Sequence, residues 1–131
     1  MDWQAALRAR AIGNGALTTL LGGQKIYWEN APQGTARPYV TLLDVTELRP
    51  QILNGYDLEQ ARVQIDVWTD KYADKQAIME AVLTALIPAN TSNGNTFQRA
   101  MIDLGPRDVA GERDGDTIIY RKTADLIIAH A

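Results

Sequence analysis

The segment ARVQIDVW, residues 61–68, constrains the fold more than any other part of the chain. Apolar and polar residues alternate through its first seven positions. Since successive side chains of a strand point to opposite faces of a sheet, this alternation predicts a β-strand with one buried and one solvent-facing side. Trp68 falls on the polar side and is therefore a candidate for an aromatic residue at a surface or interface.

A long amphipathic helix is predicted directly after this strand, over residues 70–86. Asp70 or Asp74 lies near its N-terminal end, where the helix dipole favours negative charge, and Pro88 follows its C-terminal end. Apolar side chains recur at spacings of three and four residues and form a wide stripe, which we expect to pack on the sheet. The stripe consists of Ile78, Met79, Val82, Leu83 and Leu86.

Shorter elements are predicted around this strand and helix. A chain of 131 residues fits one domain, so residues 1–131 are assigned to a single domain. The order of elements, with hairpins flanking one long helix, predicts an α+β fold: a mainly antiparallel sheet of four to five strands, the long helix packed on one face, and short N-terminal helices. The shorter helices are expected over residues 2–12 and 16–21, and the other strands over residues 25–28, 38–45, 97–104 and 117–130.

The stretch APQGTARPYV joins a turn-rich loop to the start of a strand. Pro38 has no backbone N–H to donate and therefore belongs at the first residue of a strand or on a sheet edge. Arg37, directly before it, is pushed towards extended backbone. These two residues end the loop and start the strand in a fixed register.

The residues that most enzymes and metal sites use are scarce. The chain has no cysteine and one histidine, His130, which is expected to be a solvated side chain at a strand end. Carboxylates gather in residues 108–116, but their spacing differs from the twelve-residue calcium loop of an EF-hand, and we interpret the segment as a solvated hairpin tip. The residues predict no catalytic, cofactor-binding or metal-binding group. The carboxylates are Asp108, Glu112, Asp114 and Asp116.

The charge of the chain argues against direct DNA readout. The formal net charge is −3 and no cluster of Lys or Arg offsets it, so duplex nucleic acid is repelled on average. No apolar run approaches the ~20 residues of a membrane span. The first residues also lack the pattern of a secretory signal. A soluble protein made in a cytoplasm is expected.

The sequence also predicts exposed aromatic residues and three long polar loops. The patterns place Trp68 and Tyr56 at the surface and predict loops at residues 29–37, 47–58 and 89–96. Such features are typical of protein interfaces. The residues therefore indicate a binding or assembly module.

Several short motifs follow one another in a characteristic order through residues 1–87. They are Gly22-Gly23, Ile26-Tyr27, Ala31-Pro32-Gln33-Gly34, Pro38-Tyr39-Val40, Val63-Gln64-Ile65-Asp66-Val67-Trp68, and Tyr72 with the helix behind it. In this joint order and spacing the chain resembles the tail terminator, or tail completion, proteins of long-tailed phages and gene transfer agents. From residue 88 onward the similarity is general, a loop and two closing strands.

The resemblance implies a structural protein of the virion and not an enzyme. In that family a hexameric ring binds the head-proximal end of the tail tube, stops its polymerisation and offers a surface to the head connector. DNA would pass through the lumen of the ring without sequence readout. The ring would be assembled in the host cytoplasm, with no membrane and no cofactor involved.

Two other functions are kept open. A head-tail connector or stopper protein belongs to the same assembly class and also forms rings. A small enzyme that uses the carboxylates of residues 108–116 belongs to a different class.

The resemblance supplies no catalytic residues, so candidate contact surfaces are chosen by expected exposure. They are the loop at residues 29–37, the hairpin arm at residues 47–58 and the tip at residues 108–116. The candidate interface residues are Pro32, Gln33, Gly34, Arg37, Tyr56, Trp68, Arg113 and Asp114.

Overall fold

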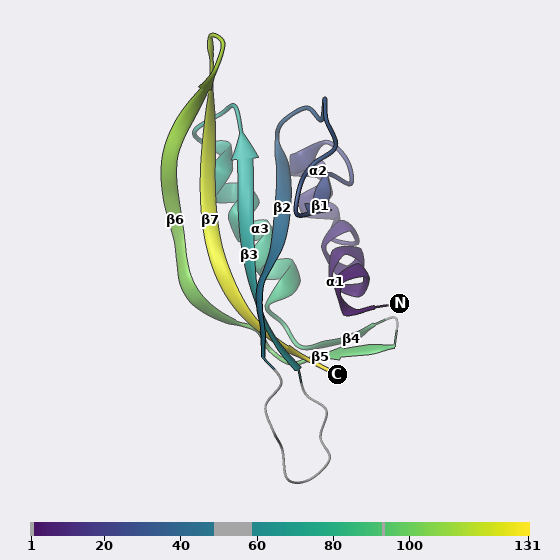
Figure 1. Cartoon of the computed structure of the whole chain (residues 1–131). Coiled ribbons are helices and arrows are strands. Elements are labelled where there is room, and N and C mark those ends of the chain that lie inside the picture. The colour runs from purple at the N-terminus through teal and green to yellow at the C-terminus, as the bar shows by residue number, and fades with distance from the viewer. Residues whose placement is uncertain (1, 49–58, 93) are drawn as a thin grey trace.

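The computed structural model describes residues 2–48, 59–92 and 94–131, which form three helices and a seven-stranded sheet (Figure 1). The helices are α1 (Trp3–Ile12), α2 (Gly15–Leu21) and α3 (Asp74–Leu86). The strands are β1 (Ile26–Trp28), β2 (Tyr39–Leu48), β3 (Glu59–Thr69), β4 (Asn90–Ser92), β5 (Asn95–Phe97), β6 (Met101–Asp114) and β7 (Thr117–His130).

The sheet is mainly antiparallel, as predicted. Its strand order is β1-β2-β3-β7-β5-β4, and β6 pairs along β7. β1 runs parallel to β2, and the other pairs are antiparallel. The mixed α and β architecture is therefore confirmed, whereas the expected number of four to five strands is wrong.

The additional strands come from segments without apolar alternation. The polar loop at residues 89–96 holds β4 and most of β5, and the strand expected at residues 97–104 is divided between β5 and β6. β6 continues to Asp114, into the segment interpreted as a hairpin tip. Almost all of its side chains are exposed. An exposed edge strand needs only backbone pairing, so its sequence carries no burial pattern.

The main helix is shorter than predicted and begins at Asp74 instead of Asp70. A turn comes first, in which the backbone N–H of Lys71 donates to Thr69 Oγ1 at 3.1 Å. The expected apolar stripe is confirmed, since Ile78, Met79, Val82 and Leu86 are buried and Leu83 is partly buried against the core. Lys75 lies on the same buried side.

The helices lie on one face of the sheet and enclose the core (Figure 1). The alternation in β3 has its predicted effect: Ala61, Val63, Ile65 and Val67 are each at most 1% exposed. The opposite face, called the open face below, carries Tyr39 and Thr41 of β2 beside Trp68 and Asp66 of β3. Charged side chains on the open face form ion pairs with one another, such as Arg121 Nε with Asp66 Oδ1 at 2.9 Å.

The single histidine is buried, and the expectation of a solvated side chain is wrong. His130 is 4% exposed, and its ring stacks on Trp3 with 4.4 Å between the ring centroids. The reason is the length of β7, which carries His130 into contact with α1 and with Phe97. No helix in the described part of the chain has the length and apolar character needed to span a membrane.

Candidate interface groove

An open groove lies where the loop before β2 approaches the tip of the β6–β7 hairpin. It has a volume of about 580 Å³ and is lined by residues 31–37 together with Tyr39, Asp70 and Asp114. Sequence reasoning selected several of these residues separately, and the structure brings five of them together. They are Pro32, Gln33, Gly34, Arg37 and Asp114.

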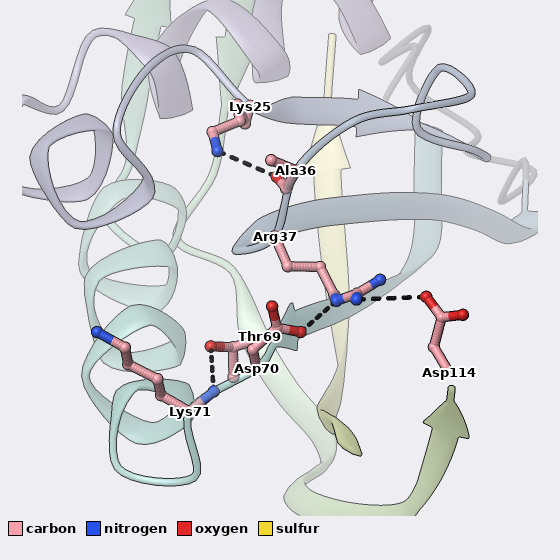
Figure 2. Close-up of polar contacts among 7 residues, drawn as sticks. All are labelled: Lys25, Ala36, Arg37, Thr69, Asp70, Lys71 and Asp114. Carbon is pink, nitrogen blue, oxygen red and sulfur yellow. Dashed lines mark hydrogen bonds and ion pairs between the residues drawn. The ribbon is translucent and has the colours of Figure 1, made fainter. Parts of the chain in front are cut away.

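The loop that forms one wall of the groove is held by its own backbone. The hydroxyl and the backbone N–H of Thr35 both donate to the carbonyl of Pro32, at 2.6 and 3.1 Å. Lys25 Nζ donates to the carbonyl of Ala36 at 3.0 Å, and Figure 2 marks this hydrogen bond with a dashed line. Gly34 has φ +84°, a backbone conformation in which a Cβ atom is unfavourable. The loop therefore has a defined shape although the side chains of Pro32, Gln33 and Ala36 are exposed.

Arg37 joins the three parts of the groove. Its Nε donates to Asp70 in the turn before α3, and its Nη2 lies 3.5 Å from Asp114 Oδ2 at the hairpin tip (Figure 2). The hydrogen bond to Asp70 is the largest cause of a raised pKa at Arg37, which keeps the guanidinium charged. The groove thus has one arginine and two aspartates, a net charge of −1.

Trp68 lies beside the groove and already has partners in the chain. Its ring stacks on Tyr39, with 6.2 Å between centroids, and its Nε1 donates to Thr41 Oγ1 at 3.0 Å. The Arg121 guanidinium lies 4.8 Å from the centre of the Trp68 ring. The ring therefore supports the groove wall from the open face, and a direct interface role for Trp68 stays a prediction.

The other candidate residues lie apart from the groove lining. Arg113 is exposed in β6, one position before Asp114. Tyr56 falls outside the described residues, as does most of the arm expected at residues 47–58.

Sequence reasoning missed the residues that hold the β6–β7 hairpin against α3. Lys75 is 6% exposed, and its Nζ lies 3.1 Å from Asp108 Oδ1. Lys122 Nζ lies 3.2 Å from the same oxygen. The Tyr72 ring covers the Lys75 ammonium at 4.0 Å from its centroid. Asp108 is therefore a docking point for β6 and is not part of a freely solvated tip.

One signal in the sequence points to this contact. Lys75 lies three and four residues before Ile78 and Met79, so it occupies a core-facing position of the helix. A charged side chain at such a position requires an opposite charge nearby.

The contact between Lys75 and Asp108 predicts a defined pH dependence. Hydrogen bonds from Lys75, and then from Lys122, lower the pKa of Asp108 from its usual value of 3.8. A lowered carboxyl pKa stabilises the fold above the unfolded-state value, and this contribution is lost as the pH falls through the folded-state pKa. We expect the free energy of unfolding of wild type to exceed that of Asp108→Asn at pH 7. This difference should disappear as the pH falls through the folded-state pKa of Asp108.

Urea unfolding of both proteins between pH 7 and pH 2 tests this expectation. Asp116→Asn is the matched control, because Asp116 is an exposed carboxylate of the same hairpin. A difference between wild type and Asp108→Asn that does not change with pH would contradict the assignment.

The carboxylates of the groove and the single histidine all have partners within the chain. The carboxylates are engaged by a guanidinium, and His130 is enclosed by Trp3 in another part of the fold. Within the described residues, no three His, Cys, Asp or Glu side chains are grouped so that they could hold a metal ion.

Comparisons with known proteins identify a family and a similar fold. Residues 5–128 match the family model described as Tail completion protein gp17. The fold is similar to that of a chain in the solved structure "Virion of native gene transfer agent (GTA) particle", with a TM-score of 0.74 and 21% sequence identity over 98% of this chain and 93% of that chain. No curated protein matches the chain. At this identity the structural likeness shows the fold alone, whereas the family match spans nearly all residues. The chain therefore belongs to the tail completion protein gp17 family and has a structural role in a virion tail.

Proposed function

We propose that the chain is a tail terminator: a hexameric ring of it caps the head-proximal end of the tail tube and stops the addition of tube subunits. The observation that carries this proposal is the match to the tail completion family over residues 5–128. The ring also presents a surface to the head connector. It is assembled in the host cytoplasm and remains in the virion.

Capping of a polymer end is a problem of binding, not of reaction. One surface of the cap has to bind the terminal tube subunits, while the opposite surface must not bind further tube subunits. The groove supplies a shaped, charged surface at which the subunits of such a cap can join, since ion pairs to Asp70 and Asp114 hold Arg37 in place. These features support a non-enzymatic role.

The charge of the chain is compatible with a ring through which DNA passes. The formal net charge is −3, so phosphates are on average repelled and not gripped. DNA would therefore move through the lumen without sequence readout.

Growth of tail tubes in solution tests the proposal. Purified tail tube protein is allowed to elongate with and without the chain, and lengths are measured by electron microscopy. We expect tubes to stop growing at substoichiometric amounts of the chain, with labelled protein at their ends. Continued growth with no label at the ends would contradict a capping role and favour a head-tail connector.

The shape of the groove loop gives a second prediction. In the double variant Pro32→Ala, Gly34→Ala, the new Cβ at residue 34 meets no atom within 4 Å, so the strain is that of the backbone alone. The expected loss in free energy of unfolding is about 1–2 kcal/mol. We expect a folded protein with weakened capping, because the loop no longer holds its contact shape.

The matched control is Pro88→Ala, Gly94→Ala, which changes the same residue types away from the groove. Gly94 also has a positive φ and open space around it. Equal capping by the two double variants and by wild type would show that the loop is not a contact surface.

A further inference from the structure

The charged side chains that line the groove, one arginine and two aspartates, leave a net negative charge, and the Lys25 ammonium outside the lining is bound to the Ala36 carbonyl. Arg37 is shared by Asp70 and Asp114, and the remaining lining residues are uncharged. The two aspartate side chains are 44% and 68% exposed, so both carboxylates remain accessible. The volume of about 580 Å³ leaves room for an additional side chain. A cationic group from outside the chain would complete the charge balance.

The hairpin tip carries such a cation on its other side. Arg113 directly precedes Asp114, and successive side chains of a strand point to opposite faces, so Arg113 points away from the groove that Asp114 lines. Its side chain is exposed and makes no ion pair, hydrogen bond or ring contact with the described residues. Each chain therefore presents a free arginine on one side of the tip and an unbalanced acidic groove on the other.

The tip is also placed where a neighbour can reach it. Pairing between β3 and β7 begins at Thr69 and Tyr120, so the hairpin beyond Tyr120 has no β3 partner. Figure 1 shows the tip extending past the end of β3. A second chain can therefore approach the Arg113 side of the tip.

We propose that the groove receives Arg113 of a second copy of this chain. This inference rests on the proposed ring. A contact between two different patches of identical subunits is heterologous, and it closes into a ring when the rotation between neighbours allows it. The planar guanidinium can donate to both carboxylates of the groove at once.

The other unpaired arginine of the strand does not meet these conditions. Arg107 of β6 lies opposite Thr123 of β7, and Thr123 lies opposite Asp66 of β3, whose side chain is on the open face. Residues directly opposite each other in paired strands have their side chains on the same face of the sheet. The Arg107 side chain therefore lies on the same side of the sheet as the groove, not on the opposite side of the tip. Arg107 serves as the matched control.

The absence of cysteine makes a cross-linking test direct. Ile118 is paired with Arg113 across the hairpin, so Ile118→Cys places a thiol beside the arginine and leaves it intact. Gln33→Cys places a second thiol in the groove. Under oxidation of the double variant, alone and in the presence of tube ends, we expect a ladder of covalent multimers. With Arg107→Cys replacing Ile118→Cys, the yield should be at least about tenfold lower.

Charge reversal then tests the role of the arginine. Adding Arg113→Glu to the cross-linking variant should lower the multimer yield at least about tenfold, because a carboxylate now faces the acidic groove. A mixture of Arg113→Glu chains with Asp114→Lys chains should recover the yield, because each groove again meets an opposite charge. Gln33→Cys and Ile118→Cys are present in both chains of the mixture.

Several results would overturn the proposal. They are a disulfide formed only within one chain, no multimers with or without tube ends, equal yields from the Ile118→Cys and Arg107→Cys variants, or no loss with Arg113→Glu. If Arg113→Glu keeps the multimers but no longer stops tube growth, the arginine contacts the tube subunit instead. The two hypotheses fail separately: tube growth that stops without cross-links removes this contact alone, and cross-links without any effect on tubes remove the proposed function alone.

Discussion

Replacing Phe97 with alanine is expected to lower the free energy of unfolding by about 3–5 kcal/mol. Phe97 is the single phenylalanine of the chain and is 1% exposed. Its pairing with His130 joins β5 to the end of β7. The Arg10 guanidinium of α1 lies 5.3 Å from the ring centroid. Truncation leaves a cavity between these elements that the sheet and helix can fill only in part.

Urea unfolding followed by circular dichroism measures this loss. Phe97→Leu is the matched control, because it keeps most of the apolar volume and should cost less than about half as much as the alanine variant. An alanine variant within ~1 kcal/mol of wild type would contradict the placement of Phe97 in the core.

Replacing Gly105 with alanine is expected to cost about 2–5 kcal/mol. Gly105 has φ +85°, and a Cβ atom built there would lie 2.8 Å from the Thr123 carbonyl oxygen and 3.0 Å from the Arg107 nitrogen. The positive φ costs a residue with a Cβ atom roughly 1–2 kcal/mol, and the overlap of that Cβ with the neighbouring backbone costs roughly 1–3 kcal/mol. β6 has register shifts on both sides of Leu104, and the backbones approach closely at this point.

Gly115→Ala separates the two contributions. Gly115 also has a positive φ, +64°, but no atom lies within 4 Å of the added Cβ. Its loss should be about 1–2 kcal/mol, clearly smaller than that of Gly105→Ala. Thermal or urea unfolding of both variants gives the comparison. Equal losses would mean that β6 and β7 are not in close contact at Gly105.

The elements with one buried face could be predicted from the sequence. β3 and the stripe of α3 each face the core along their whole length, so burial imposes a period of two or about 3.6 residues. β6 could not be predicted in this way. It is an edge strand held by backbone pairing, and its exposed side chains follow no hydrophobic period. The charges near its end therefore suggested a turn where the strand continues to Asp114.

The candidate site could be predicted in part for a similar reason. The loop before β2 was recognisable because proline and glycine restrict its backbone locally. Asp70 and Asp114 are far from that loop in sequence, and only the paired strands bring them to Arg37. The contact of Lys75 with Asp108 is likewise long-range and was not predicted, although the spacing of Lys75 from Ile78 and Met79 is a signal that it needs a partner.

The length distribution of tails tests the central claim most directly. Particles assembled with and without this chain are imaged by electron microscopy, and complementation with wild type is the control. The account predicts overlong tails of variable length without the chain and a single length once it is restored. Tails of normal length that fail to join heads would contradict termination and would instead assign the chain to the head-tail connection.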